Sequence, residues 1–266
     1  MSIAILFERQ EPAEELILSL RDIFSPIKPK SLFIYSEECP AQFPGGSGIY
    51  WFQLLPRISR AITESLELKG SPKGVLVRNY EDLSALLEMD FQGDIVADSS
   101  LYSFNSNASE VLMGLNIKRD TAPLELSLKE MEERGVENSE VTVYGRAPLM
   151  VSAQCLTVTG GRKCQKKSGF AETLTDRKGI SFPVQRDCRH CCNTIYNSVP
   201  LSLHKEIRKL KSLKPAALRF TFTNESTEEI TEILHYFVNI MLNTDTKALR
   251  CPISRYTSGH FRKGVE

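Results

Sequence analysis

The chain has no excess of charge, no long apolar run and few histidines. Its 266 residues include 33 basic and 33 acidic side chains, so its formal net charge is zero. This balance argues against a protein that binds nucleic acid with its whole surface, although a local basic patch stays compatible with it. No apolar run approaches the roughly 20 residues of a membrane-spanning helix, and we expect no membrane contact. The apolar start at residues 1–7 has no basic leader, so we expect a cytoplasmic protein.

Several motifs of common enzyme classes are missing. No G-x-G-x-x-G follows a predicted strand, and no nucleophile elbow, H-E-x-x-H or phosphate-binding loop is present. The four histidines are scattered along the chain, which gives little support to a serine or cysteine triad. The seven cysteines cannot all pair, which excludes a complete disulfide framework.

Short apolar runs alternate with amphipathic runs along the chain. Predicted helices cover residues 81–89 and 228–242, where apolar side chains recur at helical spacing. Ser127 with Glu130, and Ser226 with Glu229, have the spacing of capping boxes, and Asn107 with Glu110 is similar. An eighth strand is expected within residues 181–198. The other predicted strands are 31–35, 49–55, 74–78, 94–97, 117–126, 141–144 and 217–223.

Seven or eight such strand–helix units predict an α/β fold, a TIM-barrel-like (β/α)8 domain that spans residues 1–266. An open doubly wound sheet is the alternative. The segment 145–193 is far longer than the roughly 2–6 residues of an ordinary βα loop. We interpret it as a functional insertion after the sixth predicted strand, and residues 250–266 as a C-terminal tail.

The insertion is rich in cysteine. Four thiolates gathered in one polar loop would suit a zinc ion or an iron–sulfur cluster. The alternative is that some of them are small buried apolar side chains. Cys39 and Cys251 lie apart from the others and are interpreted as ordinary packing cysteines. His190 lies among the cysteines as a further candidate ligand, although a solvated loop histidine is the favoured interpretation. The five cysteines of the insertion are Cys155, Cys164, Cys188, Cys191 and Cys192.

Polar side chains stand at the ends of predicted strands. In a (β/α)8 barrel the carboxyl ends of the strands meet at one mouth, where active sites form. Arginines at such a mouth would hold an anionic substrate through paired hydrogen bonds. For each residue alone, a helix cap or an ion pair is an equal alternative. The candidate catalytic residues are Arg78, Asp98, Glu125, Tyr144, Arg219 and Glu225.

Basic residues cluster in three places and could contact phosphates. One cluster surrounds Cys164, a second lies on a predicted helical stretch at 204–214, and a third crowds the tail at 250–263. A solvated helix face explains the second cluster equally well. The residues around Cys164 are Arg162, Lys163, Lys166 and Lys167.

Several segments resemble the peptidase U32 family, also called collagenase-like proteases. The similarity covers roughly residues 50–266 and is densest in its second half. The matching runs are GVLVRN (74–79), VADSSLYSFN (96–105), VYGRAPLMVSAQC (143–155), DRKGISFPV (176–184), DCRHCCNTIYNS (187–198), LRFTFTNES (218–226) and SGHFRKGVE (258–266).

The resemblance implies a barrel-like catalytic domain that carries an oxygen-sensitive 4Fe-4S cluster. By the same resemblance the ligands are Cys155, Cys164, Cys188 and either Cys191 or Cys192. Some relatives act in hydroxylation of tRNA or rRNA bases with prephenate as hydroxyl source, and others in quinone hydroxylation. We therefore expect an iron–sulfur enzyme of RNA base hydroxylation, with RNA and an anion such as prephenate as partners.

Two alternatives remain at the sequence level. A collagenase-like peptidase needs an activated nucleophile or an open metal site, whereas a four-cysteine site is closed. A non-catalytic barrel with structural zinc is the other alternative. The peptidase signature of the family's first barrel is missing, and in long members this pattern belongs to a C-terminal portion. Another U32 barrel or subunit is therefore a further expected partner.

Overall fold

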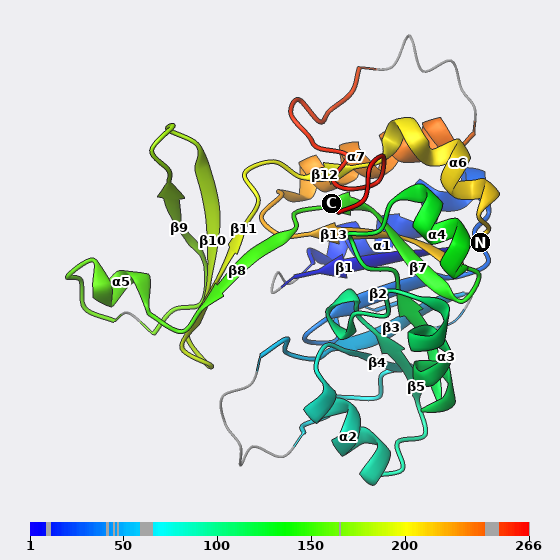
Figure 1. Ribbon diagram of the computed structural model, residues 1–266, viewed down its shortest axis with the longest axis horizontal. Coiled ribbons are helices and arrows are strands. Elements are labelled where there is room, and N and C mark those ends of the chain that lie inside the picture. The colour runs from blue at the N-terminus through cyan, green and yellow to red at the C-terminus, as the bar shows by residue number, and fades with distance from the viewer. Residues whose placement is uncertain are drawn as a thin grey trace.

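The fold is a closed barrel of eight parallel strands surrounded by helices (Figure 1). The computed structural model describes residues 1–8, 12–40, 43–44, 46, 48–58, 66–164, 166–242 and 250–265. The strands run in the order β7-β13-β1-β2-β3-β4-β5-β6, and pairing of β6 with β7 closes the barrel. The expected TIM-barrel-like (β/α)8 fold is thus confirmed. The barrel strands are β1 (Ser2–Phe7), β2 (Leu32–Ser36), β3 (Ile49–Leu54), β4 (Gly74–Val77), β5 (Asp94–Ala97), β6 (Ile117–Thr121), β7 (Ser139–Gly145) and β13 (Ala217–Phe222).

The eighth barrel strand is β1, and its expected place within residues 181–198 is wrong. All six residues of β1 are buried, and it pairs with β13 on one side and β2 on the other. Ala4 and Leu6 point into the barrel, whereas Ile3, Ile5 and Phe7 pack under the helices. A strand buried on both faces is a continuous apolar run without the alternation that marks a half-buried strand. At residues 1–7 such a run is therefore not distinguished by its pattern from an apolar terminal segment.

Helices cover the outside of the barrel. Capping boxes begin α4 at Ser127 and α7 at Ser226, as the sequence predicts. Asn79 caps α2, and α3 is capped by Asn105 rather than by Asn107, because the Asn105 side chain accepts from Ala108 N. The helices are α1 (Glu14–Phe24), α2 (Tyr80–Glu88), α3 (Ser106–Gly114), α4 (Leu128–Arg134), α6 (Ile207–Ser212) and α7 (Thr227–Met241), with 3₁₀ turns η1 (Ser25–Ile27), η2 (Ser99–Leu101) and η3 (His204–Glu206).

The main core lies between the strands and the helices. Phe220 of β13 meets Phe237 of α7 edge to face, with ring centroids 5.0 Å apart. Both side chains are fully buried, and each buried ring of this kind contributes roughly 1.5–3 kcal/mol. The interior of the barrel is filled by fewer apolar side chains, among them Phe52 and Leu76. This leaves room for the polar side chains described below.

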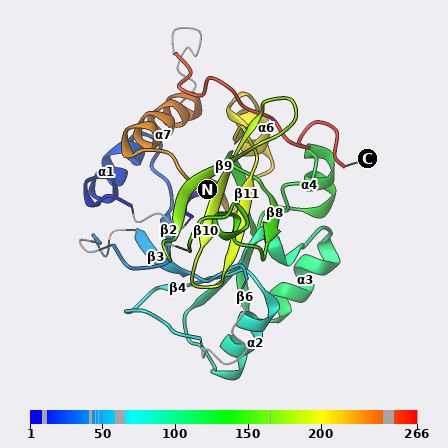
Figure 2. The same cartoon turned by 90° about the vertical axis from the view of Figure 1, so that its left-hand side faces the viewer.

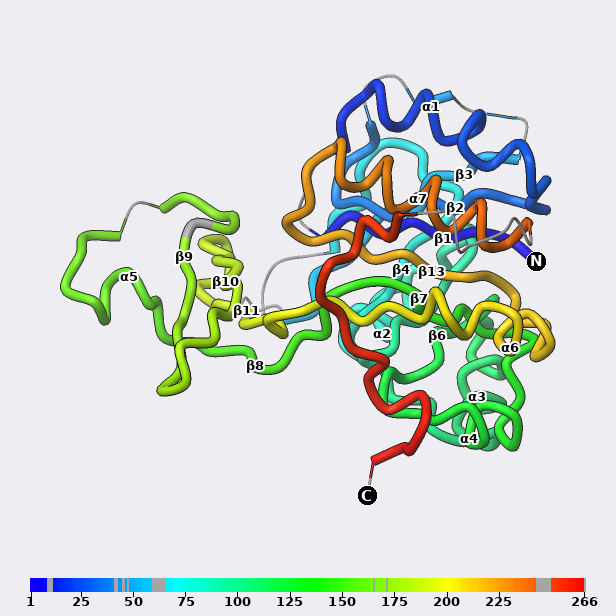
Figure 3. Tube along the Cα trace, turned by 90° about the horizontal axis from the view of Figure 1, so that it is seen from above, coloured from blue at the N-terminus to red at the C-terminus, as the bar shows by residue number. Residues whose placement is uncertain are grey.

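The segment after β7 forms a second sheet that projects from the barrel, here called the arm (residues 148–196) (Figures 1 and 3). Its antiparallel strands lie in the order β8-β11-β10-β9, and the barrel chain resumes through the short strand β12 (Leu201–Ser202), which pairs with β7. With β1 counted, the insertion follows the seventh barrel strand. The elements of the arm are β8 (Pro148–Ser152), α5 (Leu156–Thr159), β9 (Gly169–Thr175), β10 (Ser181–Asp187) and β11 (Cys192–Tyr196).

The arm stands over one opening of the barrel. Seen from the side of the arm, its strands overlie the barrel centre and the helices surround them (Figure 2). Two contacts fix it there: Gln185 Nε2 donates to Glu8 O, and Arg189 Nη2 pairs with Glu37 Oε2 at 2.6 Å. Glu8 and Glu37 follow β1 and β2 directly, so the arm covers the end of the barrel at which the strands' carboxyl ends meet. Within the described residues, no helix is long and apolar enough to span a membrane.

Candidate active site at the barrel mouth

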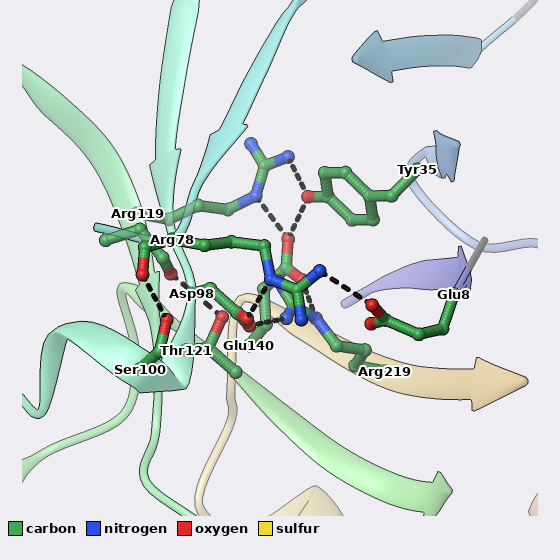
Figure 4. A network of polar contacts seen from close by, with 10 residues as sticks. Glu8, Tyr35, Arg78, Asp98, Ser100, Arg119, Thr121, Glu140 and Arg219 are labelled. Atoms are coloured by element: carbon green, nitrogen blue, oxygen red, sulfur yellow. Dashed lines mark hydrogen bonds and ion pairs between the residues drawn. The ribbon is translucent and has the colours of Figure 1, made fainter. Parts of the chain in front are cut away.

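A buried polar network fills the barrel beneath the arm (Figure 4). Its centre is Glu140 of β7, which is fully buried. Glu140 Oε1 accepts hydrogen bonds from Tyr35 Oη at 2.5 Å and Arg119 Nε at 2.7 Å. Glu140 Oε2 accepts from Arg219 Nε at 2.8 Å. Glu140 of β7 thereby joins residues of β2, β6 and β13 inside the barrel.

A second layer lies nearer the mouth. Arg219 Nη1 donates to Asp98 Oδ1 at 2.6 Å, and Arg78 Nε lies 3.2 Å from Asp98 Oδ2. Arg78 Nη1 also donates to Glu8 Oε1 at 2.8 Å. Three of the residues predicted at strand ends, Arg78, Asp98 and Arg219, are therefore brought into one cluster. Arg78 and Asp98 directly follow the neighbouring strands β4 and β5, whereas Arg219 lies on β13, more than 100 residues later in the sequence.

The electrostatics keep these groups ionised. Burial opposes ionisation of Asp98, but Arg219 and Arg78 lower the pKa of its carboxyl below the ordinary value. Burial likewise opposes the charged form of Glu140, and Arg219 and Arg119 lower its pKa. Burial and the neighbouring Glu140 raise the pKa of Tyr35, so this phenol stays protonated and donates. The result is a rigid set of charges of the kind that stabilises a bound polar group.

A cavity of about 70 Å³ opens between this cluster and the arm. Four arginines line it, Arg57, Arg78, Arg146 and Arg219, against two carboxylates, Glu8 and Asp98. Cys192, Thr194 and Tyr196 of β11 close the opposite side, since alternate residues of a strand share a face. The lining side chains alone have two more positive than negative charges, and outside the lining Glu140 pairs with Arg219 and Glu225 lies 3.9 Å from Arg146.

Arg219 supplies a further sign of a ligand. Its side chain is 2% exposed, and its Nη2 atom has no hydrogen-bond partner among the described residues. A buried N–H without a partner costs about 1–3 kcal/mol, and a carboxylate or phosphate oxygen in the cavity would satisfy it.

The remaining candidate catalytic residues lie elsewhere. Tyr144 Oη donates to Glu225 Oε1 at 3.0 Å, and both line a neighbouring cavity of about 230 Å³ rather than the one at the mouth. Glu125 is half-buried on the loop after β6 and lines neither cavity. Sequence reasoning missed Glu8, Tyr35, Arg119 and Glu140. Only Glu8 had a local signal, because it is the first charged residue after an apolar run.

The cysteines lie on the arm. Cys188 follows β10, Cys155 precedes α5, and Cys164 lies on the connection from α5 to β9. Burial raises the pKa of the Cys188 thiol, and so do the nearby Cys164 and Cys155, whereas Arg186 lowers it. Cys164 and Cys155 are therefore near enough to Cys188 to disfavour its thiolate.

Cys191 and Cys192 differ in their surroundings. Cys191 is exposed on the β10–β11 turn, and its Sγ lies 3.9 Å from Cys188 O. Cys192 is buried and lines the cavity at the barrel mouth. The choice of fourth ligand would therefore decide how close a metal group lies to that cavity.

The donor set of the arm fits an iron–sulfur cluster in its chemistry. Arg186 on β10 is 4% exposed and has a buried Nε without a partner among the described residues, so a cluster sulfur could accept from it. Arg186 Nη1 donates to Thr157 Oγ1 at 2.8 Å, which ties the segment after Cys155 to the strand before Cys188. Over the described part of the chain, however, no three His, Cys, Asp or Glu side chains already form a metal site. Such a site would be completed by the ligand itself.

A serine–histidine contact exists, but it is not placed for catalysis. Ser202 Oγ lies 2.8 Å from His204 Nδ1. Both residues are buried, the rings of Tyr236 and Tyr256 pack against the imidazole, and neither residue lines a described cavity at the mouth. Burial, with a smaller effect of Lys205, lowers the pKa of His204 to about 4. This pair therefore gives no support to the peptidase alternative.

Comparison with known proteins assigns no family. No family model matches the chain, and no curated protein sequence matches it. Among solved structures, the crystal structure of chitinase ChiW from Paenibacillus sp. str. FPU-7, a multi-modular enzyme, is 10% identical with a TM-score of 0.27. The match covers 85% of this chain and 29% of that chain. At this TM-score the likeness carries no argument about fold or activity.

Proposed function

We propose that this chain is an enzyme of the U32 type that acts in RNA base hydroxylation. In this proposal the barrel mouth binds a small organic dianion, such as prephenate, and the arm carries a 4Fe-4S cluster. The class of reaction rests on the sequence resemblance. The assignment of the anion site to the mouth and of the cluster to the arm rests on the placement of the arginines and the cysteines.

One observation carries the proposal: the unpartnered Nη2 of the buried Arg219 at a cavity lined by four arginines. A cavity of about 70 Å³ has the volume of roughly two water molecules, which suits the carboxylate or phosphate end of a larger molecule. Asp98 and Glu140 hold the guanidinium in place, so little reorganisation is needed when an anion binds.

The cluster would be held by Cys155, Cys164, Cys188 and either Cys191 or Cys192. When bound, it would supply redox chemistry beside the mouth. This chain's own residues have other tasks: Arg78 and Arg219 orient the anion, and Tyr196 and Cys192 on β11 restrict access of water from the arm side.

Calorimetric titration with prephenate tests the anion site. Binding should weaken at least about tenfold in Arg57→Gln, because Arg57 lines the cavity while its side chain is only half-buried. Arg219→Lys should abolish binding, although it also disturbs the buried network. The matched control is Arg255→Gln, an exposed arginine at the neighbouring cavity, which should bind normally. Equal binding by Arg57→Gln and the unaltered protein would contradict the proposed anion site.

Oxygen-free purification with iron and sulfide analysis tests the cluster. Cys188→Ala should lose iron, whereas Cys251→Ala, a cysteine outside the arm, should keep it. Comparing Cys191→Ala with Cys192→Ala then identifies the fourth ligand. Colourless protein with stoichiometric zinc would favour the structural-metal alternative instead.

The proposed hydroxylation is tested by analysing the modified bases of cellular RNA. Mass spectrometry of nucleosides from cells that lack this protein should show one base without its added oxygen atom. The unaltered chain should restore that oxygen and Cys188→Ala should not. An unchanged nucleoside profile would refute RNA base hydroxylation.

A further inference from the structure

Charge is divided unequally between the two parts of the molecule. The arm (148–196) has eight basic and three acidic side chains, a net charge of +5, whereas the rest of the chain has 25 basic and 30 acidic side chains, a net charge of −5. The net charge of zero for the whole chain is therefore the sum of a positive arm and a negative barrel.

Two of the eight basic side chains of the arm have structural roles. Arg186 is buried within the sheet, and Arg189 pairs with Glu37 of the barrel. The other six lie on two outer segments, and all six are exposed. Arg162 pairs with Glu172 at 2.9 Å but remains 64% exposed. The six are Arg162, Lys163, Lys166 and Lys167 on the α5–β9 connection, with Arg177 and Lys178 at the β9–β10 turn.

Both outer segments lie on the part of the molecule farthest from the barrel helices (Figures 1 and 3). Their side chains are therefore not needed to fold the barrel. Lysines and arginines held in solvent on a projecting sheet can neutralise successive phosphates of a flexible polyanion. The negative barrel would repel the same polyanion, so binding would be confined to the arm.

We propose that the two outer basic segments of the arm bind the phosphate backbone of single-stranded RNA and present one nucleotide to the barrel mouth. This inference rests on the proposed function, because it takes RNA as the polyanion. The arm stands over the barrel mouth (Figure 2), so a strand held by its outer segments would extend along the arm toward that mouth. A single strand is required, since chemistry on a base needs that base unstacked from its neighbours.

The expected binding is independent of sequence and sensitive to salt. Contacts to phosphates position a nucleic acid without reading its bases. For single strands the logarithm of affinity falls against the logarithm of salt with a slope of about −0.7 per phosphate contacted. Six contacts would give a slope of about −4.

Fluorescence anisotropy with a labelled oligouridine, in salt from low to physiological, measures this directly. The triple variant Lys163→Gln, Lys166→Gln, Lys167→Gln should bind about tenfold or more weakly and reduce the slope by about 2. Arg177→Gln with Lys178→Gln should have a similar but smaller effect. The matched control is Arg208→Gln, Lys211→Gln, Lys214→Gln, which removes three exposed positive charges near α6 and should bind as before.

The outcomes separate this inference from the proposed function. Loss of oligouridine binding in the arm triple, with normal iron content and normal prephenate binding, supports RNA binding by the arm. Equal binding by the triple and the control triple overturns it, whatever the activity of the protein. Tighter binding of polyglutamate than of oligouridine would also overturn it, and would point to an acidic protein as partner.

Discussion

The barrel and the arm bury charge in different ways. In the barrel, the buried guanidiniums of Arg78, Arg119 and Arg219 each meet a carboxylate within 3.2 Å. In the arm most charges are exposed, and Leu149 and Met150 are more than half exposed as well. The barrel is thus a closed structure that positions a few charged groups tightly, whereas the arm is a projecting sheet that keeps most of its charged side chains in solvent. This contrast suits a fixed small-molecule site beside a surface that receives a larger partner.

The largest expected effect is on the barrel. Glu140→Gln removes the charge that Arg119 and Arg219 share, and leaves two buried guanidiniums undercompensated. We expect a loss of about 3–5 kcal/mol in the free energy of unfolding, measured by urea denaturation. Glu125→Gln, a half-buried glutamate near the same mouth, should change it by less than about 0.5 kcal/mol. Similar values for the two variants would show that the network is not what stabilises the barrel.

The next prediction concerns the pH dependence of stability. It depends on His204, which follows the arm in the sequence and packs on the barrel. Its pKa is lowered to about 4 from the ordinary 6.5, so the fold favours the neutral imidazole. The contribution of neutral His204 to the free energy of unfolding is complete above about pH 6.5. It is lost as the pH falls toward 4, by about 3 kcal/mol in all. Between pH 7.5 and 4.5, the free energy of unfolding measured by denaturation should therefore decline less in His204→Phe than in the unaltered protein. Parallel curves for the two proteins would contradict this assignment.

The smallest expected effect on stability belongs to the arm. Arg186→Gln breaks the contact with Thr157 that joins the segments of Cys155 and Cys188. We expect lower iron retention but a loss of no more than about 1–2 kcal/mol in global stability, because the barrel core is untouched. Arg189→Gln, at an exposed ion pair of the same arm, is the control and should retain iron. A loss of stability as large as that of Glu140→Gln would mean that arm and barrel do not behave as separate regions.

Local pattern was sufficient for much of the barrel. The strand 94–97 was predicted with the bounds of β5, and the capping boxes at Ser127 and Ser226 were placed correctly. Each depends on residues within one strand or one helical turn, where side-chain chemistry decides conformation directly. β1 was missed because a fully buried strand does not alternate, and 117–126 was too long because apolar residues continue past the end of β6.

The sequence by itself determined the kinds of groups available: arginines and carboxylates at strand ends, and five cysteines in one insertion. Tertiary structure alone decided which of them meet. Closure of the barrel brought Arg78, Asp98 and Arg219 together and left Glu125 outside, and it placed Tyr35 against Glu140, a pair 105 residues apart in sequence. The pleat of β11 turned Cys192 toward the mouth while Cys191 stayed exposed. The physical reason is that a buried charge is stabilised by whichever partner the fold places beside it, and sequence spacing does not record that distance.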